Sequence, residues 1–247
     1  MTLVVDIGNT RLRWARSDGS HLTERGNAIY PRTGVRQVLD ACWSGLVRPY
    51  RVFVCNVAGR LIAGVLSTWV TERWGCPVDF VVPRSEGWGV TNGYEDPTSL
   101  GADRWAALIA AHRNFSAPVC VVDCGTAITI DMLAAGGRHL GGLILPGLTL
   151  MRRSLSQHTS AIPEVVGGSL SEFGRTTNDA VAAGTFYAAV ALVDRVMSAA
   201  QAAQEAAVTC VVCGGDAKLL APHFARSAVD EPDLVLLGTA IMAEAIA

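Results

Sequence analysis

Two acidic stretches of this chain combine residue types that bind phosphate. They are Leu3-Val4-Val5-Asp6-Ile7-Gly8-Asn9-Thr10 and Val121-Val122-Asp123-Cys124-Gly125-Thr126-Ala127. A glycine after an apolar strand lets the backbone approach a phosphate closely, and hydroxyl and amide side chains donate hydrogen bonds to its oxygens. The carboxylate can hold water or Mg²⁺. Each stretch therefore indicates a strand and a phosphate-binding turn, although one copy alone would equally fit a buried strand whose Asp caps a hairpin.

The two stretches are copies at a fixed offset. Asp123 lies 123 − 6 = 117 residues after Asp6 in a chain of 247 residues, so the repeat divides the chain almost in half. Residues 11–14 and 128–131 alternate in polarity after each copy, which predicts the return strand of a hairpin. A third stretch, residues 211–217, is a strand that runs into paired glycines and then a helix. We predict two related halves, residues 1–116 and 117–247.

Composition argues against several classes of protein. Half of the residues are hydrophobic, 17% are charged and the formal net charge is −2, which argues against a nucleic-acid or membrane footprint. No uninterrupted apolar run reaches the roughly 18 residues of a membrane span, and Asp6 interrupts the apolar N-terminus. We therefore expect a cytoplasmic enzyme with neither a signal peptide nor a membrane segment.

The cysteines and the lysine restrict the chemistry further. The seven cysteines include Cys210 and Cys213, a C-x-x-C pair that suggests zinc or redox chemistry. These two lie in a strand pattern, where positions i and i+3 face opposite sides, so we interpret them as small buried hydrophobes. The only lysine is Lys218, so a Gly-Lys-Ser/Thr phosphate loop is absent. If the chain binds ATP, it does so without a P-loop lysine.

Helices and strands mix in both halves. Helices are predicted over residues 34–43, 60–74, from Asp103 on, and over 148–155, 176–204, 217–223 and 236–245. Besides the two hairpins, strands are predicted over residues 51–57, 78–82, 119–123 and 208–213. Residues 17–34, 84–103 and 157–178 are expected to be loops. This mixture predicts mixed sheets covered by helices.

Asp103 is a third acidic residue of interest. It follows the loop that contains Tyr94 and stands at the start of a predicted helix. An Asp at a helix start is a favoured N-cap, worth about 1 kcal/mol. The functional alternative is a carboxylate that positions a substrate hydroxyl, with Arg104 beside it to stabilise phosphoryl charge.

The three turns, in this order, resemble the superfamily of actin, sugar kinases and heat-shock chaperone ATPases, and the resemblance implies that residues 211–217 form its adenosine-side turn. That resemblance implies an α/β, duplicated ribonuclease H-like fold, with two mixed sheets and flanking helices around a central cleft. Within it, the chain resembles the type III pantothenate kinase family. The motifs that carry this closer resemblance are Asp6-Ile7-Gly8-Asn9-Thr10, Gly101-Ala102-Asp103-Arg104, Asp123-Cys124-Gly125-Thr126-Ala127, Gly141-Gly142-Leu143-Ile144-Leu145-Pro146-Gly147, Thr176-Thr177 and Gly214-Gly215-Asp216.

The family resemblance implies a role for each matching residue. ATP would be bound by Asp6, Ile7, Gly8, Asn9, Thr10, Arg11, Leu12, Arg13 and Thr126, and pantothenate by Tyr94, Gly101, Ala102, Asp103, Arg104 and Thr177. Asp103 would accept the proton of the primary hydroxyl of pantothenate. Asp123 would bind K⁺ or ammonium, and Asp6 would hold Mg²⁺ through water. Thr177 would contact pantothenate either within one subunit or across a homodimer interface, and its choice over Thr176 rests on counting back from Gly184.

Two alternative functions stay open at this point. A regulatory or accessory protein of the same fold would have lost its activity, although Asp6, Asp103 and Asp123 are all present. Another small-molecule kinase of the superfamily is the second alternative, although the Cys-rich zinc segment of one such group is missing. The prediction is an ATP-dependent pantothenate kinase that contacts neither nucleic acid nor membrane.

Overall fold

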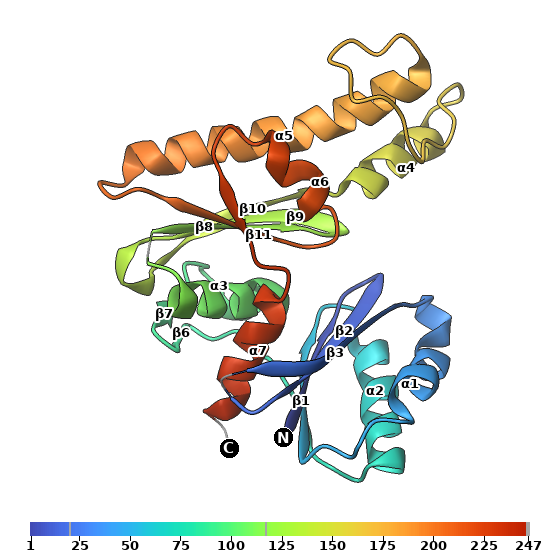
Figure 1. The fold of residues 1–247 in the computed structure, drawn as a ribbon, viewed down its shortest axis with the longest axis vertical. Coiled ribbons are helices and arrows are strands. Elements are labelled where there is room, and N and C mark those ends of the chain that lie inside the picture. Colours follow the sequence, from blue (N-terminus) through green and yellow to red (C-terminus); the bar gives the residue numbers. More distant parts are fainter. Residues whose placement is uncertain (20, 117, 246–247) are drawn as a thin grey trace. The chain divides into compact units, whose positions relative to one another are not determined.

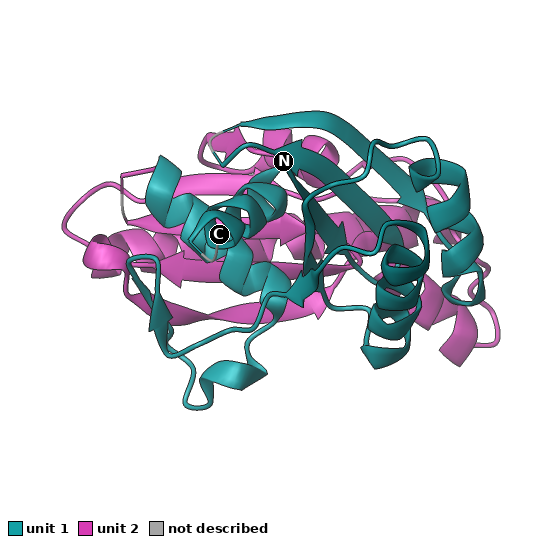
Figure 2. Cartoon of the chain, turned by 90° about the horizontal axis from the view of Figure 1, so that it is seen from below, with its two compact units in different colours: residues 1–114, 233–247 teal, residues 115–232 magenta. Residues whose placement is uncertain are grey.

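The computed structural model describes residues 1–19, 21–116 and 118–245, which form two compact units (Figures 1 and 2). Unit 1 comprises residues 1–114 together with the C-terminal residues from Asp233 on, and unit 2 comprises residues 115–232. The two units differ from the predicted halves chiefly at the C-terminus. The last helix was assigned to the second half, but it packs within unit 1.

Unit 1 is built on a five-stranded sheet in the order β3-β2-β1-β4-β5. Its strands are β1 (Thr2–Ile7), β2 (Arg11–Ser17), β3 (Leu22–Ile29), β4 (Arg51–Asn56) and β5 (Val78–Phe80). Its helices are α1 (Val35–Trp43), α2 (Arg60–Arg73), α3 (Ala102–Asn114) and α7 (Leu234–Glu244), with a short hairpin of β6 (Glu86–Gly87) and β7 (Val90–Thr91). β1 pairs antiparallel with β2 and parallel with β4, so it is the central strand.

Unit 2 repeats this topology in the order β10-β9-β8-β11-β12. Its strands are β8 (Val119–Cys124), β9 (Ala127–Leu133), β10 (His139–Pro146), β11 (Thr209–Cys213) and β12 (Ala228–Asp230). Its helices are α4 (Leu148–His158), α5 (Thr177–Ala203) and α6 (Ala217–Leu220). Because β8 pairs antiparallel with β9 and parallel with β11, it occupies the position that β1 holds in unit 1. The predicted duplication and the mixed sheets are confirmed.

The central strands are apolar because both of their faces are covered. In β1, Leu3, Val5 and Ile7 join the core under α1 and α2, whereas Val4, on the opposite face, is also fully buried, and α7 packs against this strand. A strand buried on both faces is written as a continuous apolar run, without alternation. Asp6 interrupts that run where the strand approaches its end, and it is half-buried there.

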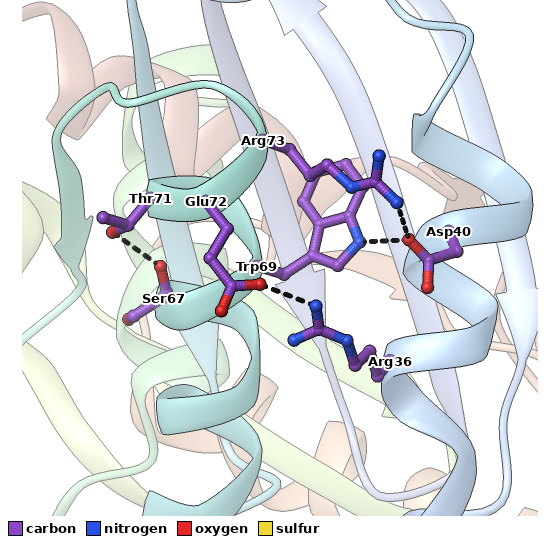
Figure 3. A network of polar contacts seen from close by, with 7 residues as sticks. All are labelled: Arg36, Asp40, Ser67, Trp69, Thr71, Glu72 and Arg73. Carbon is purple, nitrogen blue, oxygen red and sulfur yellow. Dashed lines mark hydrogen bonds and ion pairs between the residues drawn. The ribbon is translucent and has the colours of Figure 1, made fainter.

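Tryptophan side chains dominate the core of unit 1 under α1 and α2. Trp43 stacks on Trp74 with ring centroids 5.6 Å apart, and Trp69 meets both rings edge-on. At the surface, the Trp69 indole N–H donates to Asp40 (2.9 Å) and Arg36 pairs with Glu72 (2.6 Å) (Figure 3). These contacts fasten α1 to α2, and the hydrogen bond from Trp69 is the main cause that lowers the pKa of Asp40.

The long helix α5 begins as the sequence predicts. Thr176 is its N-cap and accepts a hydrogen bond from the Asp179 amide, the arrangement that favours a helix start. By length and composition alone, α5 could cross a membrane. This is weak evidence for a membrane span, because half of the helix's apolar window is buried inside the structure. Phe186, Val190 and Val193 place it in the core of unit 2 against β8 and β11. In Figure 1, α5 runs along this sheet.

The sequence analysis did not predict β3 or β10, which are the third strands of the two sheets in chain order. Residues 17–34 were expected to be a loop, yet β3 spans Leu22–Ile29, and β10 spans His139–Pro146 where only a lead into a helix was expected. Both are edge strands with mostly exposed side chains. Without a buried face there is no apolar alternation, so the signal that marks a strand is absent.

The last helix, α7, lies against α3 at very short range. A Cβ atom at Gly238 would overlap the carbonyl group of Ala106, so only glycine fits this crossing. The helix is almost entirely apolar and its residues Leu234, Leu236 and Thr239 are buried. The internal repeat in the sequence shows which motifs of the two halves correspond. It does not determine against which unit the C-terminal helix packs.

Gly238→Ala should therefore destabilise the protein by about 1–3 kcal/mol, because overpacking forces the helix backbones apart. Gly64→Ala is the matched control, since Gly64 lies exposed in α2 with open space around its Cβ position. That change should be neutral or should stabilise by up to about 1 kcal/mol through helix propensity. Urea unfolding of both variants measures the difference, and equal stabilities would contradict the close packing of α3 and α7.

Candidate active site

The first predicted phosphate turn joins β1 to β2 in unit 1. The Gly8 amide donates to the Arg11 carbonyl (3.0 Å), which closes the turn, and Asn9 and Thr10 are exposed at its tip. Asp6 is half-buried just before the turn. Exposed donors in a tight turn beside a carboxylate can hold a phosphate and its hydrated cation.

Not every residue predicted in this turn presents its side chain to a ligand. Ile7 and Leu12 are 0% and 1% exposed and belong to the core under α1 and α2, so only their backbone groups are available to a nucleotide. Arg11 is exposed and donates to Asn27 (3.2 Å). The guanidinium of Arg13 is bound to Asp233 at 2.6 Å, so much of its charge is neutralised within unit 1.

The second turn and the predicted adenosine-side turn lie next to each other in unit 2. Cys213 at the end of β11 is in register with Asp123 near the end of β8, and the Asp216 amide donates to the Cys124 carbonyl (2.9 Å). Gly214 has φ +92°, and a Cβ atom there would lie 2.5 Å from Asp123 Oδ1. Only glycine can bring these two turns so close. Thr126 is exposed at the tip of the second turn.

Acidic groups gather at these strand ends. Burial raises the pKa of Asp216, and Arg152 partly opposes the shift. Burial, followed by the charges of Asp123 and Asp216, raises the pKa of the Cys124 thiol to about 12. Cys124 is therefore a neutral thiol at physiological pH, and the local field favours a bound cation.

The C-x-x-C pair is split between the faces of the sheet, as predicted. Cys210 lies in the core that faces α5, and burial raises its pKa to about 11. Cys213 is buried but is not part of that core. All seven cysteines are free thiols in the structure. A thiol with a raised pKa is a poor nucleophile, so Cys210 acts as a packing group.

In unit 1, the segment from residue 84 to the start of α3, called the acceptor loop below, brings together three of the predicted substrate residues with that helix. The Arg104 guanidinium donates to the Tyr94 hydroxyl (2.5 Å) and lies 5.2 Å from the centre of its ring. Arg104 is 5% exposed, and a charged side chain is almost never buried to this extent unless it is paired. Arg104 and the half-buried Tyr94 therefore form a fixed cationic and aromatic wall next to Asp103.

Asp103 lies inside the first turn of α3. Its Oδ1 atom accepts the Arg104 amide (2.8 Å), so it satisfies one amide of the helix start while the residue remains partly exposed. A Cβ atom at Gly101 would lie 2.5 Å from Asp103 Oδ1, which explains the glycine two residues before the acid. Ala102 is buried and contributes packing and backbone. The structural and functional interpretations of Asp103 are thus compatible.

Asn92 is a site residue that the sequence analysis missed. Its side-chain amide donates to the carbonyls of Arg84 and Pro97 (both 3.1 Å), and its Oδ1 atom accepts the Tyr94 amide (3.0 Å). One buried side chain thus ties the two ends of the acceptor loop together and places Tyr94. The Asn-Gly pair at 92–93 is a turn signal that could have indicated this residue.

Thr177 is the first residue of α5 in unit 2 and is exposed. The loop before it is held to the helix by Asp179, which accepts the Ser169 amide and the Thr176 hydroxyl, both at 2.8 Å. These hydrogen bonds lower the pKa of Asp179. Thr176 is occupied as the N-cap, which leaves Thr177 as the better candidate for a ligand contact.

The carboxylates of Asp6 and Asp123 are oxygen ligands, which suit ions that prefer oxygen. Among residues 1–19, 21–116 and 118–245, no three His, Cys, Asp or Glu side chains gather as a metal cage. Mg²⁺ usually keeps several waters and is held by one or two carboxylates with substrate phosphates, which suits Asp6. Asp123, between the second turn and Gly214, offers a carboxylate to a larger cation.

Solved structures share this duplicated fold. The Campylobacter jejuni protein described as a Baf family transcriptional activator matches with a TM-score of 0.65 at 24% identity, over 99% of this chain and 100% of that one. A glucokinase of the ROK family from Streptomyces griseus, crystallised with glucose and AMPPNP, matches with a TM-score of 0.52 at 14% identity, over 99% of both chains. Two five-stranded units with paired acidic turns define the actin and sugar-kinase class of ATPase folds.

Sequence relatives narrow this class to one family. The family described as "Type III pantothenate kinase" matches residues 2–199. Type III pantothenate kinases of Nitrosococcus oceani and Burkholderia lata are 40% and 36% identical, over 99% and 98% of this chain and 94% of each relative. The chain belongs to the type III pantothenate kinase family.

Proposed function

We propose that this chain transfers the terminal phosphoryl group of ATP to the primary hydroxyl of pantothenate, yielding 4'-phosphopantothenate in the first step of coenzyme A biosynthesis. The observation that carries this proposal is the Tyr94–Arg104–Asp103 arrangement in a chain of this family. The buried guanidinium of Arg104 suits the carboxylate of pantothenate, and the ring of Tyr94 suits its apolar body. The carboxylate of Asp103 suits its hydroxyl.

Phosphoryl transfer depends mainly on alignment and charge neutralisation. The acceptor oxygen forms a bond to the terminal phosphorus while the bond from that phosphorus to the bridging oxygen of ADP breaks. Asp103 orients the hydroxyl and receives its proton, and ADP leaves with the bridging oxygen. Arg104 is buried and fixed, so it can neutralise the carboxylate of the acceptor without reorganising.

The nucleotide is assigned to the turns that carry exposed donors. In unit 1 these donors are Asn9 and Thr10, within the stretch from Asp6 to Arg13 that is assigned to ATP, and in unit 2 the donor is Thr126. Mg²⁺ would accompany the phosphates and be held by Asp6 through water, and it would supply charge neutralisation. Asp123 would hold K⁺ or ammonium, supported by the acidic surroundings of the second turn.

A coupled ADP-release assay with a panel of acceptors tests the substrate and the cation together. Pantothenate should give turnover and hexoses or N-acetylated sugars should not, because the buried Arg104 favours an anionic acceptor. Replacing K⁺ by Na⁺ should lower turnover with pantothenate, and ammonium should restore it. Turnover with a sugar would contradict the substrate, and rates independent of K⁺ and ammonium would contradict the cation.

Asp103→Asn should lower kcat with pantothenate by about 10²-fold or more, because the amide cannot accept the proton of the hydroxyl. Glu95→Gln is the matched control, since Glu95 is an exposed acid in the loop that precedes α3. Steady-state kinetics and thermal unfolding should be measured on both variants. A folded Asp103→Asn protein with near-normal turnover would refute the assignment of the proton acceptor.

A homodimer is proposed through the edge strand β10. Leu140, Leu143 and Ile144 on this strand are 41%, 45% and 63% exposed, and an apolar edge strand is a ready surface for pairing with a second chain. A partner subunit would then contribute Thr177 to the pantothenate site.

Sedimentation velocity checks this assembly. Ile144→Asp should shift the protein toward monomer, because it would bury a charge at the interface. Leu61→Asp is the control, since Leu61 is 86% exposed on α2 and belongs to the other unit. A monomeric wild-type protein, or an unchanged dimer of the Ile144→Asp variant, would contradict β10 as the interface.

A further inference from the structure

The residues that follow the third strands, Tyr30 and Gly147, occupy equivalent positions in the two units. They are separated by 147 − 30 = 117 residues, the same offset that relates Gly8 to Gly125. Tyr30 follows β3 and Gly147 follows β10, and each of these strands pairs with the second strand of its own sheet. The duplication therefore places both residues next to a phosphate turn.

Tyr30 makes two hydrogen bonds to the first turn. Its hydroxyl donates to the carbonyl of Gly8, and its amide donates to the carbonyl of Thr10 (3.2 Å). The residue is 3% exposed and its ring belongs to the core under α1 and α2. Burial raises the pKa of the hydroxyl, an effect that Arg32 opposes and Asp6 reinforces. The hydroxyl is therefore a permanent donor in the neutral pH range.

Gly147 meets the second turn in a different way. Its amide donates to the carbonyl of Thr126 (2.9 Å), which corresponds to Asn9 at the same offset, whereas the Tyr30 amide donates one residue further on, to Thr10. A Cβ atom at Gly147 would overlap the carbonyl oxygen of Gly125. The same carbonyl, that of the turn glycine, is thus approached in both units. In unit 1 a hydroxyl reaches it, and in unit 2 the bare backbone packs on it.

We propose that Tyr30 is a positioning residue for the nucleotide, whose hydroxyl holds the Gly8 carbonyl so that the following amide, that of Asn9, faces the phosphates. The physical reason is the planar trans peptide, in which the carbonyl and the next N–H are rigidly linked and point in opposite directions. A carbonyl fixed toward the core fixes the N–H toward the exposed side of the turn. This inference rests on the proposed binding of ATP at this turn.

Tyr30→Phe tests the proposal because the ring stays in the core and only the donor is lost. We expect the KM for ATP to rise about three- to tenfold, the range of one neutral hydrogen bond, while the KM for pantothenate stays unchanged. Direct titration with a non-hydrolysable ATP analogue should show the same loss of affinity.

Tyr187→Phe is the matched control, since the Tyr187 hydroxyl donates to the Leu170 carbonyl (2.8 Å) and so joins α5 to the loop before this helix in unit 2. It should lower thermal stability without changing the KM for ATP. If Tyr30→Phe behaves in the same way, or raises both KM values equally, Tyr30 has only a structural role. If the wild type binds the analogue but does not phosphorylate pantothenate, the proposed function fails, while the titration still decides the role of Tyr30.

Discussion

Close approach of backbone to backbone at the ends of parallel strands is the constraint on which both units depend. In unit 2, β8 and β11 end side by side, and the turns after them touch where Gly214 faces the carboxylate of Asp123. A side-chain carbon at this glycine would force the turns apart. In unit 1 the equivalent strands β1 and β4 are joined by the Val57 amide, which donates to the Ile7 carbonyl (3.1 Å). Asp6 and Asp123 lie near the ends of β1 and β8, and each of these strands is in parallel register with a neighbour in its own sheet, β4 or β11.

The two units have kept this scaffold and diverged around it. Unit 1 adds the acceptor loop, in which Asn92 and Tyr94 are fixed against Arg104, and it covers the other face of its sheet with α7. Unit 2 adds the long helix α5, and Thr177 is its first residue. Even the turns differ. The Gly8 amide donates to the carbonyl of Arg11, three residues on, whereas the Gly125 amide donates to the carbonyl of Ala127, two residues on. A duplicated fold has thus become one unit with the fixed pair of Tyr94 and Arg104 and another with the long helix α5.

Local sequence predicts the parts of this structure that local physics determines. The apolar runs before Asp6 and Asp123, the repeat between them, and the cap of α5 at Thr176 were all recognised from the chain alone. The edge strands β3 and β10 were missed because exposed strands lack alternation. The contact between Arg13 and Asp233 spans 220 residues, and no local sequence pattern near either residue predicts it. The side chains of Ile7 and Leu12 were included in the site with their motif, but the pleat of the sheet turns them into the core.

The tryptophan cluster gives the molecule an unequal optical signature. All six tryptophans precede residue 115, so every indole lies in unit 1, whereas unit 2 has Tyr187 as its one tyrosine and no tryptophan. Four of the indoles, Trp14, Trp43, Trp69 and Trp74, are packed ring against ring. Intrinsic indole emission therefore reports the melting of one unit alone, while backbone dichroism reports both. A comparison of the two signals would therefore show, without a label, whether the two units melt together or separately.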